Sequence, residues 1–141
     1  MRTDLPDVNV LIALFAANHE HHDAAHAWLT RAEQFATTPM TEAGFVRVMM
    51  AGTPVNAPLT CAAAIESLRE LRALPNAVFW PDATTWTDHR MVASHITGHK
   101  QVADTHLLNL AIAHGGRLVT FDRRIAPSLT RHALGHLAQL G

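Results

Sequence analysis

The chain has 141 residues, a formal net charge of −1, and 48% hydrophobic against 16% charged residues. This composition excludes a disordered chain, and one domain of this length can bury a substantial core. The near-neutral charge argues against a protein that holds nucleic acid through a broad basic surface, but it permits an enzyme that touches RNA briefly. The single cysteine, Cys61, excludes an internal disulfide.

The sequence carries no sign of export or of membrane insertion. The chain begins without the positive segment, apolar stretch and cleavage site of a secretory signal. The longest apolar run, residues 10–17, is far too short to span a bilayer. We therefore expect a cytoplasmic protein without membrane association, in which residues 1–141 form one domain.

Short strands and longer helices are expected to alternate along the first half of the chain. A strand ends at residues 5–7, where Pro6 is tolerated only if the strand is short or near an edge. Residues 8–17 are apolar on all sides, which predicts a buried helix. Residues 21–35 have the periodicity of an amphipathic helix, and residues 35–38 are a candidate strand.

The same alternation continues to the end of the chain. Thr41 is the expected cap of the third helix, and Gly115 is expected to end the helix at 103–114. The expected elements are helices at 41–51, 60–74, 83–92 and 103–114, and strands at 77–80, 117–121 and 137–140. Strands that alternate with helices predict an α/β fold, a three-layer α/β/α sandwich in which helices cover both faces of a short-stranded parallel sheet.

Four of the 12 acidic residues lie at junctions between expected elements. Asp7 and Asp122 follow strands, whereas Glu42 and Asp104 open helices. Ligands of parallel sheets bind beyond the carboxyl ends of the strands, where such residues meet. Carboxylates at that edge can hold Mg²⁺ or Mn²⁺, and these ions promote phosphodiester hydrolysis.

A purely structural interpretation of each acid is also open. Acids at helix starts are favoured by the exposed N–H groups and the helix dipole, which accounts for Asp7, Glu42 and Asp104 taken singly. Asp122 can simply begin a turn. Position alone is therefore suggestive, and the surrounding sequence must decide.

The sequence around each acid resembles a motif of the PIN domain family. In chain order, the four segments read DVNVLIAL at 7–14, TTPMTEAGFVRV at 37–48, QVADTHLL at 101–108 and GGRLVTFDR at 115–123. One such motif is weak, but four in the family's order are a strong signal. Within the family, the motifs look most like those of VapC-type toxins of toxin–antitoxin pairs.

The resemblance implies an endoribonuclease that depends on Mg²⁺ or Mn²⁺ and cleaves RNA with water as the nucleophile. Its metal-binding acids would be Asp7, Glu42, Asp104 and Asp122. Asn9 and Thr120 would support them by hydrogen bonds. The implied partners are an RNA substrate, a small antitoxin and a second copy of the chain. Two positions depart from the family pattern, Pro6 in the first strand and Ala43 beside Glu42.

Histidine pairs, a cysteine, tryptophans and two arginines are further candidates for chemistry. Helical spacing makes His22 with His26, His132 with His136 and His95 with His99 conceivable zinc pairs, but no local ligand completes them, which favours structural roles. Cys61 and the three tryptophans are expected in the core. Arg123 and Arg124 fit a phosphate contact and a solvated turn equally well.

Three other functions remain open from the sequence. A haloacid-dehalogenase-type phosphatase also begins with an Asp at a strand end, but it needs a second Asp two residues later, where this chain has Asn9. A non-catalytic PIN module that binds RNA or a protein is the main alternative. A purely structural interaction protein needs no acid cluster at all.

Overall fold

The computed structural model describes residues 1–54, 56–88, 92 and 96–141. A parallel sheet has the strand order β3-β2-β1-β4-β5. Its strands are β1 (Thr3–Pro6), β2 (Gln34–Thr37), β3 (Ala77–Phe79), β4 (Arg117–Thr120) and β5 (Leu137–Gln139). The expected three-layer α/β/α arrangement is confirmed.

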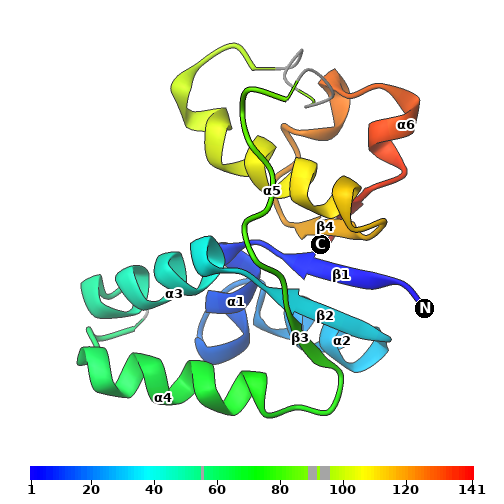
Figure 1. Ribbon diagram of the computed structural model, residues 1–141. Helices are drawn as coiled ribbons and strands as arrows, with labels where there is room; N and C mark the ends of the chain where they lie inside the picture. The colour runs from blue at the N-terminus through cyan, green and yellow to red at the C-terminus, as the bar shows by residue number, and fades with distance from the viewer. Residues whose placement is uncertain (55, 89–91, 93–95) are drawn as a thin grey trace.

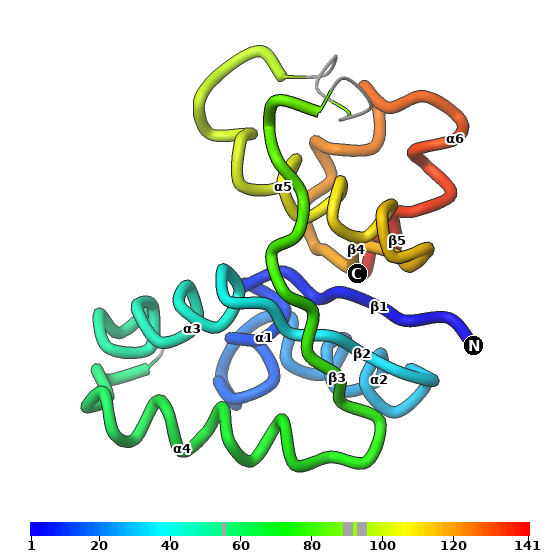
Figure 2. The backbone as a smooth tube through the Cα atoms, in the orientation of Figure 1, coloured from blue at the N-terminus to red at the C-terminus, as the bar shows by residue number. Residues whose placement is uncertain are grey.

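Helices cover both faces of this sheet (Figure 1). Those of the first half lie on one face and those of the second half on the other. Figure 2 shows the chain crossing between the two layers after β3. The first group comprises α1 (Val8–Phe15), α2 (His22–Arg31), α3 (Pro39–Ala51) and α4 (Cys61–Arg72), and the second α5 (Val102–Ala113) and α6 (Arg131–Leu134). None of the helices in the described ranges has the length and apolarity to cross a membrane.

Consecutive strand residues pack into two separate hydrophobic clusters. Phe35 and Val119 lie in the cluster that contains α1 to α4, whereas Ala36 and Leu118 lie in the cluster that contains α5. Side chains of a strand alternate between the two faces of its sheet, so β2 and β4 each contribute to both clusters. The all-round apolar character of α1 fits this packing, since its residues 10–14 are all buried.

Several boundaries differ from those expected. Helix α2 ends at Arg31, because the chain must extend into β2 three residues later. Helix α3 is capped by Thr38 rather than by Thr41. The Thr38 hydroxyl accepts the Thr41 N–H at 3.1 Å, and the Thr41 hydroxyl accepts the Thr38 N–H at 2.9 Å. Pro39 occupies the first turn, where its missing N–H costs nothing.

The helix expected at residues 83–92 is wrong. Residues 83–88 contain no helix, residue 92 is not helical either, and residues 89–91 lie outside the described part. The Thr85 hydroxyl is hydrogen-bonded to the Thr87 hydroxyl at 3.0 Å and accepts the Thr87 N–H at 3.3 Å. Such local side-chain bonds compete with helical ones. Cys61 and Trp86 are also exposed, contrary to expectation, whereas Trp28 and Trp80 are buried.

Pro6 ends the central strand rather than an edge strand. The β1–β2 pairing runs only through Asp4 and Phe35, whereas the β1–β4 pairing continues to Pro6 and Val119. Proline has no N–H to donate, so it is compatible with this position because the strand stops there. The Asp7 N–H then donates to the Val119 carbonyl at 3.0 Å and carries the contact with β4 one residue further.

A buried ion pair joins β1, β4 and α2. Asp4 is 3% exposed and accepts two hydrogen bonds from the Arg117 guanidinium, both at 3.1 Å. The Trp28 indole N–H adds a third at 2.9 Å. A buried carboxylate requires such partners, because an unsatisfied charge in the core is costly.

We expect Trp28→Phe to lower the free energy of unfolding by about 1–3 kcal/mol, since Asp4 loses a donor that water cannot replace. Urea unfolding measures this change. Trp86→Phe is the matched control, because Trp86 is 42% exposed and should cost less than about 0.5 kcal/mol. Equal losses in the two variants would contradict the role assigned to the indole N–H.

Candidate functional site

Asp7 stands where β1 turns into α1 and serves as the N-cap of that helix. Its Oδ1 accepts the Val10 N–H at 3.0 Å, and its Oδ2 accepts the Thr120 hydroxyl at 2.6 Å. Burial raises the pKa of Asp7, the hydrogen bonds from Thr120, Val10 and the Asn9 backbone oppose that rise, and the charge of Asp122 adds to it.

Thr120 connects the ends of the two central strands. Its hydroxyl donates to Asp7 and accepts the backbone N–H of Asp122 at 3.0 Å. The residue is fully buried, so its rotamer is fixed by packing. One hydroxyl therefore sets the positions of two acids that are far apart in the sequence.

Asp104 lies in the first turn of α5, above the same edge of the sheet. Its pKa is raised to about 6, first by burial and then by the negative charges of Asp7 and Asp122, while Arg124 opposes the rise. Asp7 and Asp104 line one cavity of about 440 Å³ together with Asn9, Ala43 and other residues of α1, α3 and α5. The three aspartates thus share one region.

Asp122 is paired with an arginine from its own turn. Its Oδ1 accepts the Arg124 backbone N–H at 2.9 Å and Nε–H at 3.0 Å, and its Oδ2 accepts Nη2–H at 2.8 Å. The Arg124 hydrogen bonds lower the pKa of Asp122, whereas burial raises it. Arg124, left undecided by the sequence, is therefore the ion-pair partner of a candidate site acid.

Glu42 lines a different cavity from those lined by the three aspartates. It sits in the first turn of α3, where its Oε2 accepts the Thr37 hydroxyl at 2.7 Å and lies 3.6 Å from Nε of Arg72. Glu42 lines the cavity between α3 and α4, whereas Ala43 also lines the cavity of Asp7 and Asp104. Successive helical residues are rotated by about 100°, which accounts for the difference.

The sequence alone did not identify Thr37 and Arg72 as partners of Glu42. Thr37 ends β2 as Thr120 ends β4, and each hydroxyl donates to a candidate acid. A threonine at the last position of both strands was therefore a sequence signal for a hydrogen bond to a candidate acid. Arg72 comes from α4, and its approach to Glu42 depends on how α3 packs against α4, which no local pattern reveals.

The acids form an open edge rather than a closed metal cage. Across the described residues, no three His, Cys, Asp or Glu side chains are close enough to hold one ion together. Mg²⁺ and Mn²⁺ prefer carboxylate oxygens, and Mg²⁺ usually keeps several waters with only one or two protein carboxylates. One or two of these aspartates therefore offer the donor chemistry that such an ion needs.

The histidines of α2 have structural partners. His22 Nδ1 lies 2.7 Å from the Ala13 carbonyl, and His26 Nε2 lies 2.9 Å from the Leu14 carbonyl. Carbonyls in the last turn of a helix lack helical partners, so the two rings cap α1. His136 lies beyond the end of α6 and contacts the Gly116 carbonyl at 2.7 Å. His95 lies outside the described residues.

Comparison with known proteins agrees with this architecture. The family model of the PIN domain matches residues 5–127. The chain is 42% identical over 134 residues to Ribonuclease VapC39 of Mycobacterium tuberculosis (strain ATCC 25618 / H37Rv), covering 89% of this chain and 93% of that protein. It is 38% identical over 143 residues to Ribonuclease VapC44 of the same strain, with 96% and 98% covered.

A solved structure gives the same fold at low sequence identity. It is the crystal structure of VapBC2 from Rickettsia felis bound to a DNA fragment from their promoter. The TM-score is 0.56 at 10% identity, and the match covers 99% of each chain.

The raised pKa of Asp104 predicts how stability depends on pH. The folded chain binds this proton more tightly than the unfolded chain, because the pKa is about 6 rather than 3.8. The stabilisation is complete below about pH 4 and is lost as the pH rises through 6. In metal-free protein, Asp104→Asn should therefore gain about 1–3 kcal/mol over wild type at pH 8 and little at pH 4.

Urea unfolding at both pH values, with EDTA present, measures this difference. Glu70→Gln is the matched control, because Glu70 is an exposed acid of α4. It should follow the wild-type pH profile. An Asp104→Asn profile parallel to wild type would contradict the burial and charge repulsion described for this carboxyl.

Proposed function

We propose that this chain, which belongs to the PIN domain family and to its VapC group, is the endoribonuclease toxin of a toxin–antitoxin pair. The observation that carries the proposal is the meeting of Asp7, Asp104 and Asp122 at the carboxyl edge of a parallel sheet. The chain also spans nearly the whole length of relatives named ribonucleases. We treat residues 1–141 as one catalytic domain.

The proposed metal site consists of the three aspartates and Glu42. A bound Mg²⁺ or Mn²⁺ supplies charge neutralisation and an acidified water for phosphodiester hydrolysis. Thr120 fixes the Asp7 carboxylate, and the Asn9 backbone N–H favours its ionised form. Glu42 would contribute from the end of β2, where Thr37 holds it.

The mutual repulsion of the acids supports this assignment. The charges of Asp7 and Asp122 raise the pKa of Asp104, so the folded metal-free chain keeps carboxylates close at a cost in free energy. Such an arrangement is expected where a cation or an Arg compensates the charge. Arg124 compensates Asp122 in part through an ion pair at 2.8 Å, and the Arg124 side chain is 84% exposed.

The proposed partners are RNA and a small antitoxin protein, both met in the cytoplasm. A second copy of the chain is a further proposed partner. The antitoxin proposal draws on the VapC relatives and on apolar side chains beside Glu42. Met50 is 44% exposed and Ile65 is 39% exposed, and both line the cavity between α3 and α4.

A non-catalytic PIN module is the main alternative function, and the experiments must distinguish it from the nuclease. A phosphatase of the haloacid-dehalogenase type is disfavoured, because Asn9 stands where its second Asp is needed and its side chain cannot act as a general acid.

We expect Asp7→Asn and Asp104→Asn to reduce RNA cleavage by at least about 100-fold with Mn²⁺ or Mg²⁺. Asparagine is isosteric with Asp and still caps a helix, so Asp7→Asn should fold. The measurement is sequencing of new RNA 5′ ends after expression in a bacterial host, followed by cleavage with purified protein.

Asp23→Asn serves as the matched control, since Asp23 is an exposed acid of α2. Cleavage by this variant should equal that of wild type. Folded wild-type protein, freed of any antitoxin, that produces no new 5′ ends would favour the non-catalytic module.

We also expect Mn²⁺ to bind more tightly to Arg124→Gln than to wild type, by about threefold or more. The ion must compete with three hydrogen bonds from Arg124 to Asp122, and only the backbone one survives in the variant. Mn²⁺ titration followed by electron paramagnetic resonance measures the dissociation constant. Arg131→Gln on α6 is the control, and an identical change in both variants would contradict competition at Asp122.

A further inference from the structure

We propose that the cavity on the Asp122 side of the acid edge is a subsite for one nucleotide of the RNA, in which His19 and Arg123 bind a backbone phosphate. This inference rests on the proposed ribonuclease function and adds a substrate-binding surface to it. We call this space the histidine cavity; its walls include His19, His21, Phe121 and Arg123.

The histidine cavity is directly continuous with the candidate acid site. Asp122 and Asn9 line it, and Asn9 also lines the cavity that contains Asp7 and Asp104. Its volume is about 540 Å³, within the usual range of ligand cavities, roughly 300–1,000 Å³. A nucleotide adjacent to a bond cleaved at the acids would therefore have room here.

The hydrogen bonds of His19 determine which ring nitrogen carries its proton. Its Nδ1 accepts the backbone N–H of His21 at 3.0 Å, so this nitrogen holds no hydrogen. Burial lowers the pKa of His19, and the neighbouring His21 lowers it further, which keeps the ring neutral. The neutral ring must then carry its hydrogen on Nε2, and this N–H is a donor for a phosphate or sugar oxygen.

The loop that carries His19 is held in place before any ligand binds. The His19 N–H donates to the Ala16 carbonyl at 2.8 Å, and the His22 N–H donates to the His19 carbonyl at 3.0 Å. The caps that His22 and His26 form on α1 anchor the following helix. His19 is thus preorganised, which reduces the entropy lost when it binds a ligand.

Other residues that line the histidine cavity supply positive charge and a flat surface. Arg123 donates one hydrogen bond, to the Gly141 carbonyl at 2.8 Å, from a guanidinium with five N–H groups. His21 stacks on Phe121 with ring centroids 4.1 Å apart and planes 12° apart. Donors beside an apolar wall suit a phosphate joined to a sugar and base.

Charge also favours RNA over an acidic protein segment as the occupant. Arg124 is engaged by Asp122, and Glu20 is exposed at the rim, so the cavity is not strongly cationic. The groups that it presents to a ligand are the neutral ring N–H of His19 and the guanidinium of Arg123, next to the acids. These groups match a single phosphate of a chain that passes the acid edge better than a run of carboxylates.

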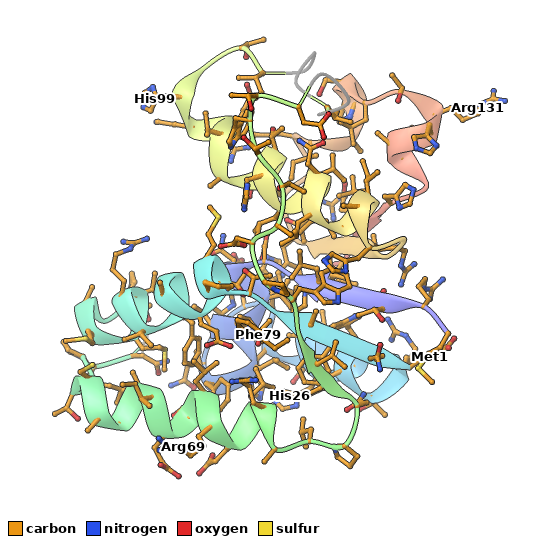
Figure 3. The ribbon with its side chains drawn as sticks, in the orientation of Figure 1. Met1, His26, Arg69, Phe79, His99 and Arg131 are labelled. Atoms are coloured by element: carbon orange, nitrogen blue, oxygen red, sulfur yellow. The ribbon has the colours of Figure 1, made fainter. Side chains whose placement is uncertain are left out.

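Two substitutions of His19 separate ligand binding from loop structure. In His19→Asn, the side-chain oxygen can still accept the His21 N–H in an Asx-turn, but the distal donor is lost. In His19→Gln, the longer amide restores a donor near the Nε2 position. The control is His132→Asn on α6, the helix whose Arg131 points outward in Figure 3.

The measurement is the dissociation constant of a fluorescein-labelled, ten-nucleotide single-stranded RNA, obtained by fluorescence anisotropy in EDTA, where metal-dependent hydrolysis cannot occur. We expect His19→Asn to bind about three- to tenfold more weakly than wild type, the effect of one lost hydrogen bond. His19→Gln should lie closer to wild type, and His132→Asn should equal it. Thermal unfolding of each variant verifies that it is folded.

The outcomes distinguish this inference from the proposed function. Wild-type protein that cleaves RNA, with His19→Asn binding RNA equally well, overturns the subsite and leaves the nuclease intact. Protein that cleaves nothing, yet binds RNA through His19, supports the subsite and overturns the nuclease. A hexaglutamate peptide whose affinity falls in His19→Asn, while that of RNA stays unchanged, also overturns the subsite.

Discussion

The parallel pairing of β1 with β4 is the constraint on which the candidate site depends. Because both strands end at the same edge, the residues that follow them, Asp7 and Asp122, must be neighbours in space. The buried hydroxyl of Thr120 converts this neighbourhood into a fixed geometry. The bidentate ion pair of Asp4 and Arg117 secures the opposite end of the same two strands. Side-chain hydrogen bonds therefore hold β1 and β4 together at both ends of the pair.

Periodicity and strand-end positions predicted the layers, the helices and the meeting of three acids, because these follow from local pattern and parallel topology. The direction of the Glu42 side chain was not predictable, since one residue of helical rotation decides between Glu42 and Ala43. The cap of α3 was misplaced by three residues because Thr38 and Thr41 are both good caps and exchange hydrogen bonds. The helix predicted from residue 83 does not form over residues 83–88, where the hydroxyls of Thr85 and Thr87 make local hydrogen bonds that compete with helical ones.

The three aspartates of the candidate site differ in their electrostatic surroundings. Asp7 is buried and its carboxylate is stabilised by hydrogen bonds, Asp104 is repelled by the charges of its neighbours, and Asp122 is paired with an arginine. A cation that arrives at this edge therefore meets carboxylates that differ in how readily they release a proton or a partner. Asp122, through Arg124, also connects this edge with the histidine cavity, because both residues line that cavity as well.

The long separation of the central strands has a consequence for the ribosome that makes the chain. The first strand is made long before its pairing partner, Arg117–Thr120, since the bonded residues Asp4 and Arg117 are 113 positions apart in the sequence. Contacts between segments so distant in sequence form late, after the intervening loop has closed. A nascent chain therefore carries Asp7 without Asp122 until β4 and the residues that follow it have been made. An enzyme that attacks RNA would in this way be harmless to the machinery translating it until its second central strand has been made.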